Sequence, residues 1–484
     1  MRNDAECRST AARVGPTPTA IDLFAGCGGL SLGLKRAGWD LLTAVEISPF
    51  ASESYFRNLL SATSQVQHSF EVHRTLDAAD QLRQGLLVGD ARTVVELEEE
   101  TRAMLGGREL GLLAGGPPCQ GFSLAGRREI DDPRNRLVWT FLDVARFTRP
   151  RLVLLENVGA IQSPFEKGQR SAVLGELESA LRGIAPELGG YRIIRALLRG
   201  DHFGVPQRRK RVFLIGVRGD LARYLKIDEW SCWDSESSSL DLNENLWIPS
   251  PSEAKSIGAE AALWDIVGKE YLPLSEAPNS VAREFARRMR HGDCVLEPRR
   301  RRLAGKEPPN HEFRRHSSRT ETRFQLMRIF RDAGIPADLF FRVGNGDLAI
   351  EEELRPLEVI LPLDLPDRKV SSTRELAIIV RSLGTRKHTQ RALDPRQPAP
   401  TVTTLPDDMG HYGANRTLSV REMARLQTFP DSFVFCGKVT TGGHSRRGEV
   451  PQYSQVGNAV PPRLAYVLGA FLFGLTQRFD NQDG

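Results

Sequence analysis

The sequence predicts an α/β fold with a second, smaller domain, and two observations predict it. From Thr19 to about Gly216, short apolar runs bounded by Gly, Pro or Asp alternate with amphipathic stretches, which is typical of strand-helix-strand units on a parallel sheet. After about Asp220 the alternation is lost, and the stretch from Ser231 to Ser239 has the composition of a linker. We therefore expect one domain before this stretch and a second domain that begins there.

Six apolar runs are the expected strands of the sheet. In chain order they are Ala20–Phe24, Leu41–Val45, Leu86–Val88, Gly111–Ala114, Arg151–Leu155 and Arg211–Ile215. Each of the first five ends beside a polar or glycine-rich turn, and open α/β sheets bind ligands at the carboxyl ends of their strands. The site is therefore expected along that edge. Near the end of the chain, the apolar run Arg463–Phe473 predicts a buried helix.

Composition limits the class of protein. The chain has 484 residues, of which 40% are hydrophobic and 26% charged, as in a globular protein. The six cysteines are scattered, with no Cys-x-x-Cys pair and no Cys/His cluster, so neither a metal site nor a disulfide framework is expected. No apolar run approaches the roughly 20 residues of a membrane-spanning helix, and the first residues lack the apolar core of a signal peptide. These features favour a cytoplasmic protein that does not enter a membrane.

Positive charge is concentrated in one segment. The chain has a formal net charge of +5, but Val281–Arg331 alone has 15 Lys+Arg and six Asp+Glu, so the rest of the chain is net negative. The densest run is Arg299–Arg302. A nucleic-acid partner explains this charge, because cations that neutralise phosphates supply most non-specific affinity; taken alone, a solvated basic surface explains it equally well. The helical spacing of Phe324, Met327 and Phe330 predicts core residues within the segment.

The first glycine-rich turn indicates a nucleotide-like cofactor. Asp22–Leu30 places glycines directly after the first expected strand, so that the backbone can approach a ligand closely. Glu46 ends the second strand, where a carboxylate can accept hydrogen bonds from two ribose hydroxyls, and Asp90 follows the third, where it can accept one from an adenine amino group. The pattern favours an adenosine-bearing cofactor but does not separate NAD from S-adenosylmethionine.

A second loop presents a candidate nucleophile. Gly115–Ser123 follows the fourth strand, and its glycines and prolines fix an extended loop around Cys119. Glu156 emerges at the same edge of the sheet, where partial desolvation would keep it protonated near neutral pH as a general acid. In the basic run that opens the sixth strand, alternation puts Arg209 and Arg211 on one face, so that this pair can enter the site.

With these blocks in place, the chain strongly resembles the DNA (cytosine-5) methyltransferases. The blocks that carry the resemblance are, in order, Asp22–Gly29, Gly116–Ser123, Glu156–Val158, Gln207–Arg211, Arg416–Pro430 and Gln455–Pro462. They span nearly the whole chain, and such an ordered set is far more specific than any one short motif. The resemblance implies the Rossmann-like sheet of an S-adenosylmethionine-dependent methyltransferase, with a target-recognition domain as the smaller second domain.

The resemblance also implies a role for each catalytic residue. Cys119 attacks C6 of cytosine, Glu156 protonates or hydrogen-bonds N3, and the ring then takes a methyl group at C5. Loss of the C5 proton expels the cysteine. Arg209 and Arg211 match an Arg-x-Arg pair, of which Arg211 is expected to hold the cytosine carbonyl and help keep Cys119 as a thiolate. Because C5 and C6 are stacked inside a duplex, the base must swing out into the pocket.

Cofactor contacts, partners and domain limits follow from the same resemblance. The cofactor-binding residues carried over are Phe24, Ala25, Gly26, Gly28, Gly29, Leu30, Glu46, Asp90, Pro117, Leu137, Asn458 and Val460. The implied partner is double-stranded DNA, a separately acting restriction endonuclease is a candidate partner, and a nucleoid-associated monomer is expected. The expected domains are a catalytic domain over 1–230, a target-recognition domain over 231–410 with the basic segment 281–331, and a C-terminal part over 411–484 that returns to the catalytic domain.

Other classes of protein fit the sequence less well. A catalytically silent DNA-binding protein would lack Cys119, Glu156 or Arg211, and all three are present. An NAD-linked oxidoreductase explains the first glycine-rich turn but leaves the Pro-Pro-Cys loop without a role. Enzymes that methylate exocyclic amines use an Asn/Asp/Ser-Pro-Pro-aromatic loop, whereas here the prolines precede the cysteine. RNA-directed relatives carry a Cys-Phe-Thr tripeptide, which this chain lacks, and this favours DNA.

Overall fold

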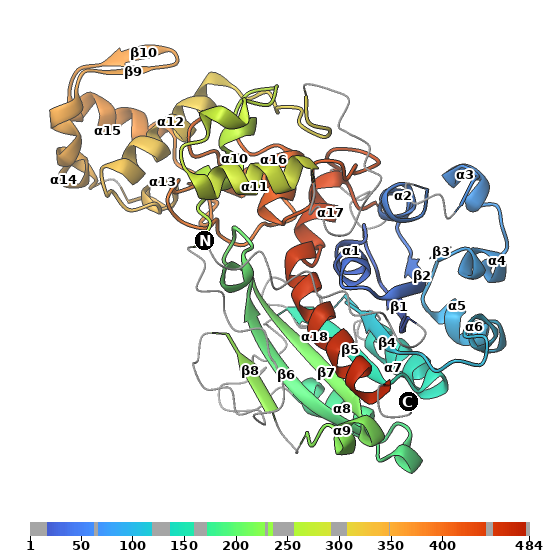
Figure 1. Cartoon of the computed structure of the whole chain (residues 1–484). Helices are drawn as coiled ribbons and strands as arrows, with labels where there is room; N and C mark the ends of the chain where they lie inside the picture. The colour runs from blue at the N-terminus through green and yellow to red at the C-terminus, as the bar shows by residue number, and fades with distance from the viewer. Residues whose placement is uncertain are drawn as a thin grey trace. The chain divides into compact units, whose positions relative to one another are not determined.

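The computed structural model divides the chain into two compact units (Figure 1). The structure describes residues 17–61, 66–118, 136–158, 172–227, 231–235, 256–291, 307–347, 349–441 and 449–480. The sheet unit comprises Met1–Arg199, Lys210–Pro251 and Leu464–Gly484, and the second unit comprises Gly200–Arg209 and Ser252–Arg463. The limits 231–410 for a recognition domain stay a prediction, because a compact unit is defined by its packing and not by what it binds.

An eight-stranded sheet is the framework of the sheet unit, in the spatial order β3-β2-β1-β4-β5-β7-β6-β8. The strands are β1 (Thr19–Leu23), β2 (Asp40–Glu46), β3 (Leu86–Val88), β4 (Leu112–Gly115), β5 (Leu152–Val158), β6 (Tyr191–Arg199), β7 (Lys210–Arg218) and β8 (Ser231–Asp234). From β3 to β5 all neighbours are parallel, whereas β7 runs antiparallel between β5 and β6. The predicted α/β fold class is confirmed, and all six expected strands are present with small differences at their ends.

Three features of the sheet differ from the expectation. The sheet is not wholly parallel, because only Gly200–Arg209 connects β6 to β7, and parallel neighbours need a crossover of a dozen or more residues. Strand β6 was missed, although its residues alternate between buried and partly buried positions. The stretch interpreted as a linker contains β8, which pairs in parallel with β6.

Helices cover the sheet and complete its core. They are α1 (Gly29–Arg36), α2 (Pro49–Tyr55), the π-helix η2 (Phe56–Leu60), α3 (Phe70–His73), α4 (Ala78–Arg83), α5 (Arg92–Glu96), α6 (Glu98–Met104), α7 (Arg136–Thr148), α8 (Ala172–Arg182), α9 (Gly219–Tyr224) and α18 (Pro462–Asp480). Apolar side chains from the strands, α7 and α8 form one buried cluster that includes Leu113, Phe141 and Leu177. Burying each such side chain contributes roughly 1.5–3 kcal/mol, so this cluster fixes the strand ends that carry the site.

The last helix of the chain packs against the first. A Cβ added at Gly33 of α1 would lie 2.3 Å from the Cβ of Ala465 in α18, so the two helices meet without room for a side chain. The indole N–H of Trp39 donates to the carbonyl of Gly469 (2.9 Å), and its ring meets Phe473 edge-on at a centroid distance of 5.7 Å. The C-terminal residues of the chain are therefore part of the sheet unit.

This C-terminal stretch is also apolar. Gln452–Asp480 is the only part of the described residues that is long and apolar enough to cross a membrane, and 67% of its most apolar window is buried inside the structure. Such burial is expected of a core helix. The predicted buried helix over Arg463–Phe473 lies within α18, where Leu464, Leu468 and Leu472 are fully buried.

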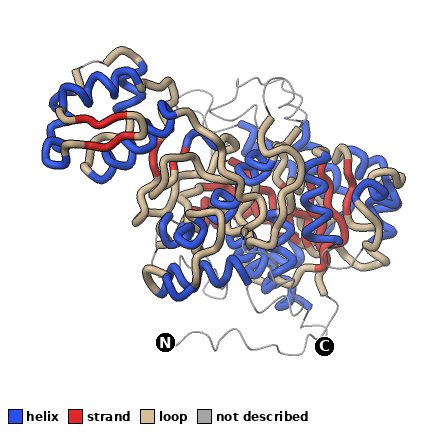
Figure 2. Tube along the Cα trace, turned by 90° about the horizontal axis from the view of Figure 1, so that it is seen from above, coloured by secondary structure: helices blue, strands red, loops and turns tan. Residues whose placement is uncertain are grey.

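The second unit is mainly helical (Figure 2). Its helices are α10 (Ala259–Leu263), α11 (Ser280–His291), α12 (Ser318–Asp332), α13 (Leu339–Gly344), α14 (Glu351–Leu354), α15 (Thr373–Ser382), α16 (Val420–Leu426) and α17 (Gln452–Asn458). Two short strand pairs accompany them: β9 (Leu363–Leu365) with β10 (Arg368–Val370), and β11 (Arg391–Ala392) with β12 (Met409–Gly410). Phe324, Met327 and Phe330 lie in an apolar cluster with α13 and α15, so their predicted place in the core is confirmed.

Buried arginines hold another part of the second unit together. The Arg425 guanidinium of α16 pairs with Asp265 and with Asp431, whose Oδ2 lies 2.6 Å from Nη2, and all three side chains are inaccessible to solvent. Although burial opposes it, Arg425 lowers the pKa of Asp431. The neighbouring Arg421 donates to the carbonyls of Pro309 (2.9 Å) and Pro430 (3.0 Å). These contacts tie segments that lie more than 100 residues apart in sequence.

Candidate active site

The first glycine-rich turn leaves open space at its tip. Gly28, the N-cap of α1, has φ +97°, and a Cβ there would lie 2.5 Å from the Leu59 side chain, so only glycine fits. Gly26 also has a positive φ, of +57°, but no atom of the described residues lies within 4 Å of the position of an added Cβ. The backbone at Gly26 therefore borders a space that a ligand can enter.

Glu46 joins this turn to the end of β2. Its Oε2 accepts a hydrogen bond from the backbone N–H of Gly26 (2.9 Å) and its Oε1 accepts one from that of Ser48 (2.8 Å). Burial raises the pKa of Glu46, although these two donors oppose the shift. Each carboxylate oxygen can accept a further hydrogen bond, so Glu46 can hold the turn and still bind hydroxyl groups.

Asp22 is a residue of interest that the sequence analysis named only as the start of a motif. It is fully buried; its Oδ2 accepts from the Ser31 hydroxyl (2.5 Å), and its Oδ1 has no hydrogen-bond partner among the described residues. Burial and the nearby charge of Glu46 raise the pKa of Asp22 to about 7. A buried polar atom without a partner is costly. A carboxyl inside the first expected strand, Ala20–Phe24, was the signal for it.

The end of β3 lies beside the end of β2. The backbone N–H of Gly89 donates to the carbonyl of Glu46 (3.1 Å). The next residue, Asp90, accepts hydrogen bonds from the Arg92 side chain and backbone, and the side-chain bond lowers the pKa of Asp90. Between these strand ends, Ile47 is 67% exposed, although it is a large apolar residue. The sequence analysis missed Ile47; its place directly after the acidic strand end was the available signal.

The cysteine loop begins against Glu156. Strands β4 and β5 are paired, with Gly115 opposite Leu155, and a Cβ added at Gly116 would lie 3.0 Å from Oε2 of Glu156. The chain then continues through Pro117 and Pro118 to the predicted nucleophile. Cys119 itself, with residues 120–135, lies outside the described residues. The root of its loop is nevertheless fixed beside the Glu156 carboxylate.

Arg211 pairs with the same carboxylate. Because β7 is antiparallel to β5, its first residues lie at the edge where β4 and β5 end, and Arg211 is opposite Val158. The Arg211 Nε lies 2.8 Å from Glu156 Oε1, and both side chains are 12% exposed. Burial lowers the pKa of Arg211, while Glu156 favours its charged form. The sequence analysis considered the desolvation of Glu156 but not this ion pair, which depends on the direction of β7.

Arg209 has a different environment from Arg211. It precedes β7, so the strand alternation that put both arginines on one face does not extend to it. In the second unit its guanidinium donates to the carbonyls of Val402 (3.1 Å) and Gly457 (2.9 Å), and it is 1% exposed. Gln207 donates to the carbonyl of Leu426 (2.9 Å) and its Oε1 accepts from the N–H of Val402 (3.0 Å).

Comparison with known proteins decides the family. A sequence model described as C-5 cytosine-specific DNA methylase matches residues 19–86 and 94–473. The chain belongs to this family. It is a DNA (cytosine-5)-methyltransferase, which methylates cytosine in DNA, and the resemblance stated from the sequence is confirmed. Asp90 falls in the gap between the two matched ranges, whereas the other carried-over residues fall inside them.

Several proteins are similar to this methyltransferase over most of its length. The Type II methyltransferase M.DdeI of Desulfomicrobium norvegicum is 30% identical over 456 residues, which cover 93% of this chain and 86% of that protein. The Type II methyltransferase M1.HphI of Haemophilus parahaemolyticus is 28% identical, with 93% and 85% covered. Among solved structures, a prophage-encoded E. coli protein assigned as a DNA modification methyltransferase has a TM-score of 0.56 and 20% identity, covering 95% and 99% of the two chains, which supports the fold alone.

The remaining carried-over residues of this methyltransferase lie in both units. Phe24 is half-buried with φ +60°, Ala25, Gly29 and Leu30 are buried, and Pro117 is buried at the root of the cysteine loop. Leu137 is half-buried at the start of α7. Asn458 is the exposed last residue of α17, and Val460 is buried two residues later. Both belong to the second unit. Their part in cofactor binding stays a prediction.

Proposed function

We propose that this enzyme transfers the methyl group of S-adenosylmethionine to C5 of a cytosine that has swung out of a specific double-stranded DNA sequence, through a covalent bond between Cys119 and C6. The observation that carries the proposal is the Glu156–Arg211 ion pair beside Gly116. This pair brings a hydrogen-bonding carboxylate and a cation to the root of a loop whose next residues are Pro-Pro-Cys.

The residues around the first glycine-rich turn fit the methyl donor. The cofactor is a nucleoside with a positively charged sulfur, and when bound it supplies an electrophilic methyl group. Glu46 binds its ribose hydroxyls, Asp90 accepts from its adenine amino group, and Ile47 offers an apolar surface to the adenine ring. The open space at Gly26 admits the ligand, and the unpartnered oxygen of buried Asp22 favours a cationic one. Phe24, Gly28 and Leu30 form the surrounding wall.

Cys119 supplies the electrons that cytosine lacks. Its thiolate forms a bond to C6, and the C5–C6 double-bond electrons move into the ring toward N3 and the carbonyl oxygen. Glu156 in its protonated form donates to N3 and Arg211 donates to the carbonyl oxygen, so that both stabilise the charge that develops. C5 is then nucleophilic and accepts the methyl group, whose bond to the sulfonium breaks to leave S-adenosylhomocysteine. When a base removes the C5 proton, the double bond re-forms and the Cys119–C6 bond breaks.

Arg209 supports this chemistry by holding other residues in place. Its hydrogen bonds to the carbonyls of Val402 and Gly457 join two of the family's sequence blocks, Gln207–Arg211 and Gln455–Pro462, to the segment at Val402. Loss of these bonds would free Asn458, which follows Gly457 and is proposed to contact the cofactor. Arg209 is therefore a positioning residue in the proposal, and Arg211 is the catalytic member of the pair.

DNA binding, partners and location follow from the proposed reaction. Swinging a base out costs roughly a few kcal/mol of stacking and pairing, and the cations of the second unit offset this cost by binding phosphates. We propose that the enzyme works as a monomer on chromosomal DNA in the cytoplasm. Two relatives carry the name Type II methyltransferase, which makes a separately acting restriction endonuclease the proposed partner.

Trapping of the covalent bond tests the proposal. A fluorine at C5 cannot leave as a proton would, so duplex DNA with 5-fluorocytosine is expected to retain the wild-type enzyme as an adduct that survives denaturing electrophoresis when S-adenosylmethionine is present. Cys119→Ala should form no adduct. Bisulfite sequencing of host DNA then gives the methylated sequence. An adduct with Cys119→Ala, or 5-methylcytosine formed at the wild-type rate by that variant, would overturn the proposal.

A further inference from the structure

Two arginines of α12, Arg323 and Arg328, lack the carboxylate partners that some other buried arginines of the second unit have among the described residues. Arg425 pairs with two carboxylates, Arg416 pairs with Glu422 (2.7 Å), and Arg421 donates to backbone carbonyls. Arg323, although half-buried, pairs with no carboxylate of the described residues, and its Nε is buried without a hydrogen-bond partner. Burial, together with the charge of Arg319 one turn away, lowers its pKa. The positive charge of Arg323 is therefore partly buried and not balanced by a carboxylate of the described residues.

A buried amide holds this arginine in position. The Nη1 of Arg323 lies 3.4 Å from Oε1 of Gln390, which is 6% exposed, and the Gln390 amide donates to the carbonyl of Asp407 (2.8 Å). Gln390 is thus fixed at both ends of its amide group. A neutral amide orients a guanidinium without neutralising it, so most of the donors of Arg323 remain available for another acceptor.

More cations lie around Arg323 than carboxylates. The side chains linked to it, which we call the α12 basic face, are Arg314, Arg319, Arg323 and Lys387. Arg314 and Lys387 share one carboxylate, that of Asp407 (2.9 Å from the Lys387 Nζ), and within the described part of the chain Arg319 donates only to the carbonyl of Ser382. Although burial opposes it, Lys387 and Arg314 lower the pKa of Asp407, which is therefore charged. One carboxylate cannot neutralise four cations.

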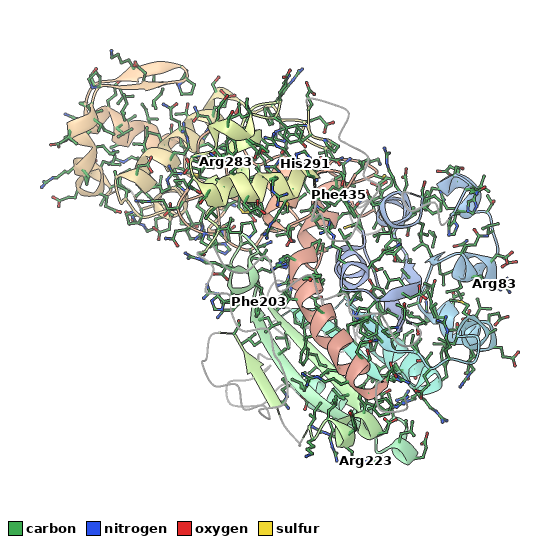
Figure 3. All side chains as sticks on the ribbon, viewed as in Figure 1. Arg83, Phe203, Arg223, Arg283, His291 and Phe435 are labelled. Carbon is green, nitrogen blue, oxygen red and sulfur yellow. The ribbon has the colours of Figure 1, made fainter. Side chains whose placement is uncertain are left out.

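The other long arginine-bearing helix of the second unit shows the contrast. In α11, Arg287 and Arg288 pair with Glu284, and Arg290 pairs with Asp265. Figure 3 labels Arg283, in the first turn of this helix, and His291, its last residue. In α11 three of the four arginines pair with carboxylates of the same unit, and Arg283 donates to the carbonyl of Leu274, whereas on the α12 basic face four cations share one carboxylate. The α12 basic face therefore suits an external anion.

We propose that the α12 basic face binds the DNA substrate and that Arg323 is its base-reading residue. The proposal rests on the proposed function, since it assumes a specific duplex sequence. A guanidinium held in one orientation can donate two hydrogen bonds to O6 and N7 of guanine, and this contact distinguishes guanine from the other bases. Arg314, Arg319 and Lys387 are exposed, and exposed cations on long side chains bind phosphates without reading sequence. Arg323 therefore determines specificity, and its neighbours determine affinity.

The two roles predict different responses to substitution. Arg323→Lys keeps the charge but removes the paired donors, so it should lower kcat/KM on the wild-type sequence about 10- to 100-fold and relax the sequence at one guanine position. Arg319→Ala and Lys387→Ala should each weaken binding to cognate and non-cognate duplexes equally. Each should also reduce the slope of log affinity against log salt concentration by about one. Arg355→Lys, on an exposed arginine paired with Glu352, is the matched control and should change neither quantity.

Gln390→Glu gives a second variant that keeps Arg323 in place. The new carboxylate can pair with the guanidinium and compete with guanine, so the preference for cognate over non-cognate DNA should fall about tenfold, while loss of the donor to the Asp407 carbonyl should lower the melting temperature by a few degrees. Full-length wild type and variants are compared by bisulfite sequencing of host DNA and by duplex binding at several salt concentrations. This inference alone would be overturned if Arg323→Lys and Gln390→Glu kept the methylated sequence, the rate and the preference for cognate DNA. It would also be overturned if both variants weakened binding to cognate and non-cognate duplexes equally. No 5-methylcytosine in wild-type samples would overturn the proposed function together with it.

Discussion

The two units of the chain bury different kinds of side chain. Between the strands and α7 of the sheet unit, the buried layer is apolar, as at Leu113 and Phe141. Around α16 of the second unit, the buried layer contains full charges, with Arg425 between Asp265 and Asp431. Apolar packing tolerates many similar side chains, whereas a buried charge needs its particular partner. The sheet unit is thus fixed by its pattern of residues, and this part of the second unit by individual pairs.

At the edge of the sheet, the Glu156–Arg211 pair has a proposed role in the reaction. Glu156→Gln keeps the size of the side chain but removes the carboxylate that pairs with Arg211. We expect the rate of methyl transfer to fall by about 10²- to 10⁴-fold, with the melting temperature shifted by only a few degrees, since both side chains remain partly exposed. Single-turnover methyl transfer and calorimetry measure the two quantities.

A matched control for Glu156 exists at the other end of the strands. Glu109 lies before β4 and pairs with Arg151 and Arg218, each at 2.8 Å. Glu109→Gln should keep the rate within about twofold, because this carboxylate lies at the amino end of the strands. Equal loss of rate in both variants would show that ion pairs in this unit act only through the fold.

Arg425 tests the ionic part of the comparison. Arg425→Met leaves Asp431 buried without its cation, while Asp265 keeps Arg290, so it should lower the free energy of unfolding by about 3–5 kcal/mol. Urea denaturation followed by circular dichroism measures the loss. Adding Asp431→Leu should restore part of it, since the unpaired carboxylate is then removed. A single variant with the wild-type urea midpoint would remove the distinction between the units.

Asp22 gives the sheet unit one pH-dependent element. The pKa of Asp22 is about 7 in the fold and near 3.8 in the unfolded chain. Its contribution to the free energy of unfolding is therefore largest below about pH 4 and is lost as the pH rises to about 7. The loss corresponds to about 4 kcal/mol at most. Asp22→Asn removes this titration, and its melting temperature relative to wild type should therefore rise between pH 4 and pH 8. Parallel melting curves over this range would contradict the assignment.

The smallest effect is expected at an exposed pair. Arg83, labelled in Figure 3, pairs with Asp80 on the surface of α4, where both side chains are about half exposed. Arg83→Ala should change the free energy of unfolding by less than about 1 kcal/mol. Calorimetry provides the measurement. A loss as large as that of Arg425→Met would show that burial does not explain the difference between these two arginines.

Local patterns predicted most of the sheet and missed what depends on its topology. The six expected strands were found because each is a short apolar run ended by a turn residue. Strand β6 was missed because Arg192, Arg195 and Arg199 interrupt its apolar run, and β8 because its serine-rich surroundings resembled a linker. The antiparallel direction of β7 could not be read from its own residues, since it depends on the length of Gly200–Arg209.

The candidate site divides in the same way. Residue type and place at a strand end were enough to single out Glu46, Asp90 and Glu156. The Glu156–Arg211 pair was not expected, because it depends on a strand that runs against its neighbour. The unpartnered oxygen of Asp22 and the exposure of Ile47 are properties of the packed fold and have no counterpart in a motif. The roles of all these residues in catalysis stay a prediction.

The contact between α18 and α1 has a consequence for the newly made chain. Gly33, near the N-terminus, is covered by Ala465, and the Trp39 indole donates to Gly469. While the ribosome is still adding the intervening residues, this face of α1 has no cover and the sheet unit is incomplete. The sheet unit is thus completed only after the residues of α18 have been made, so deleting Leu464–Asp480 should leave this face of α1 uncovered.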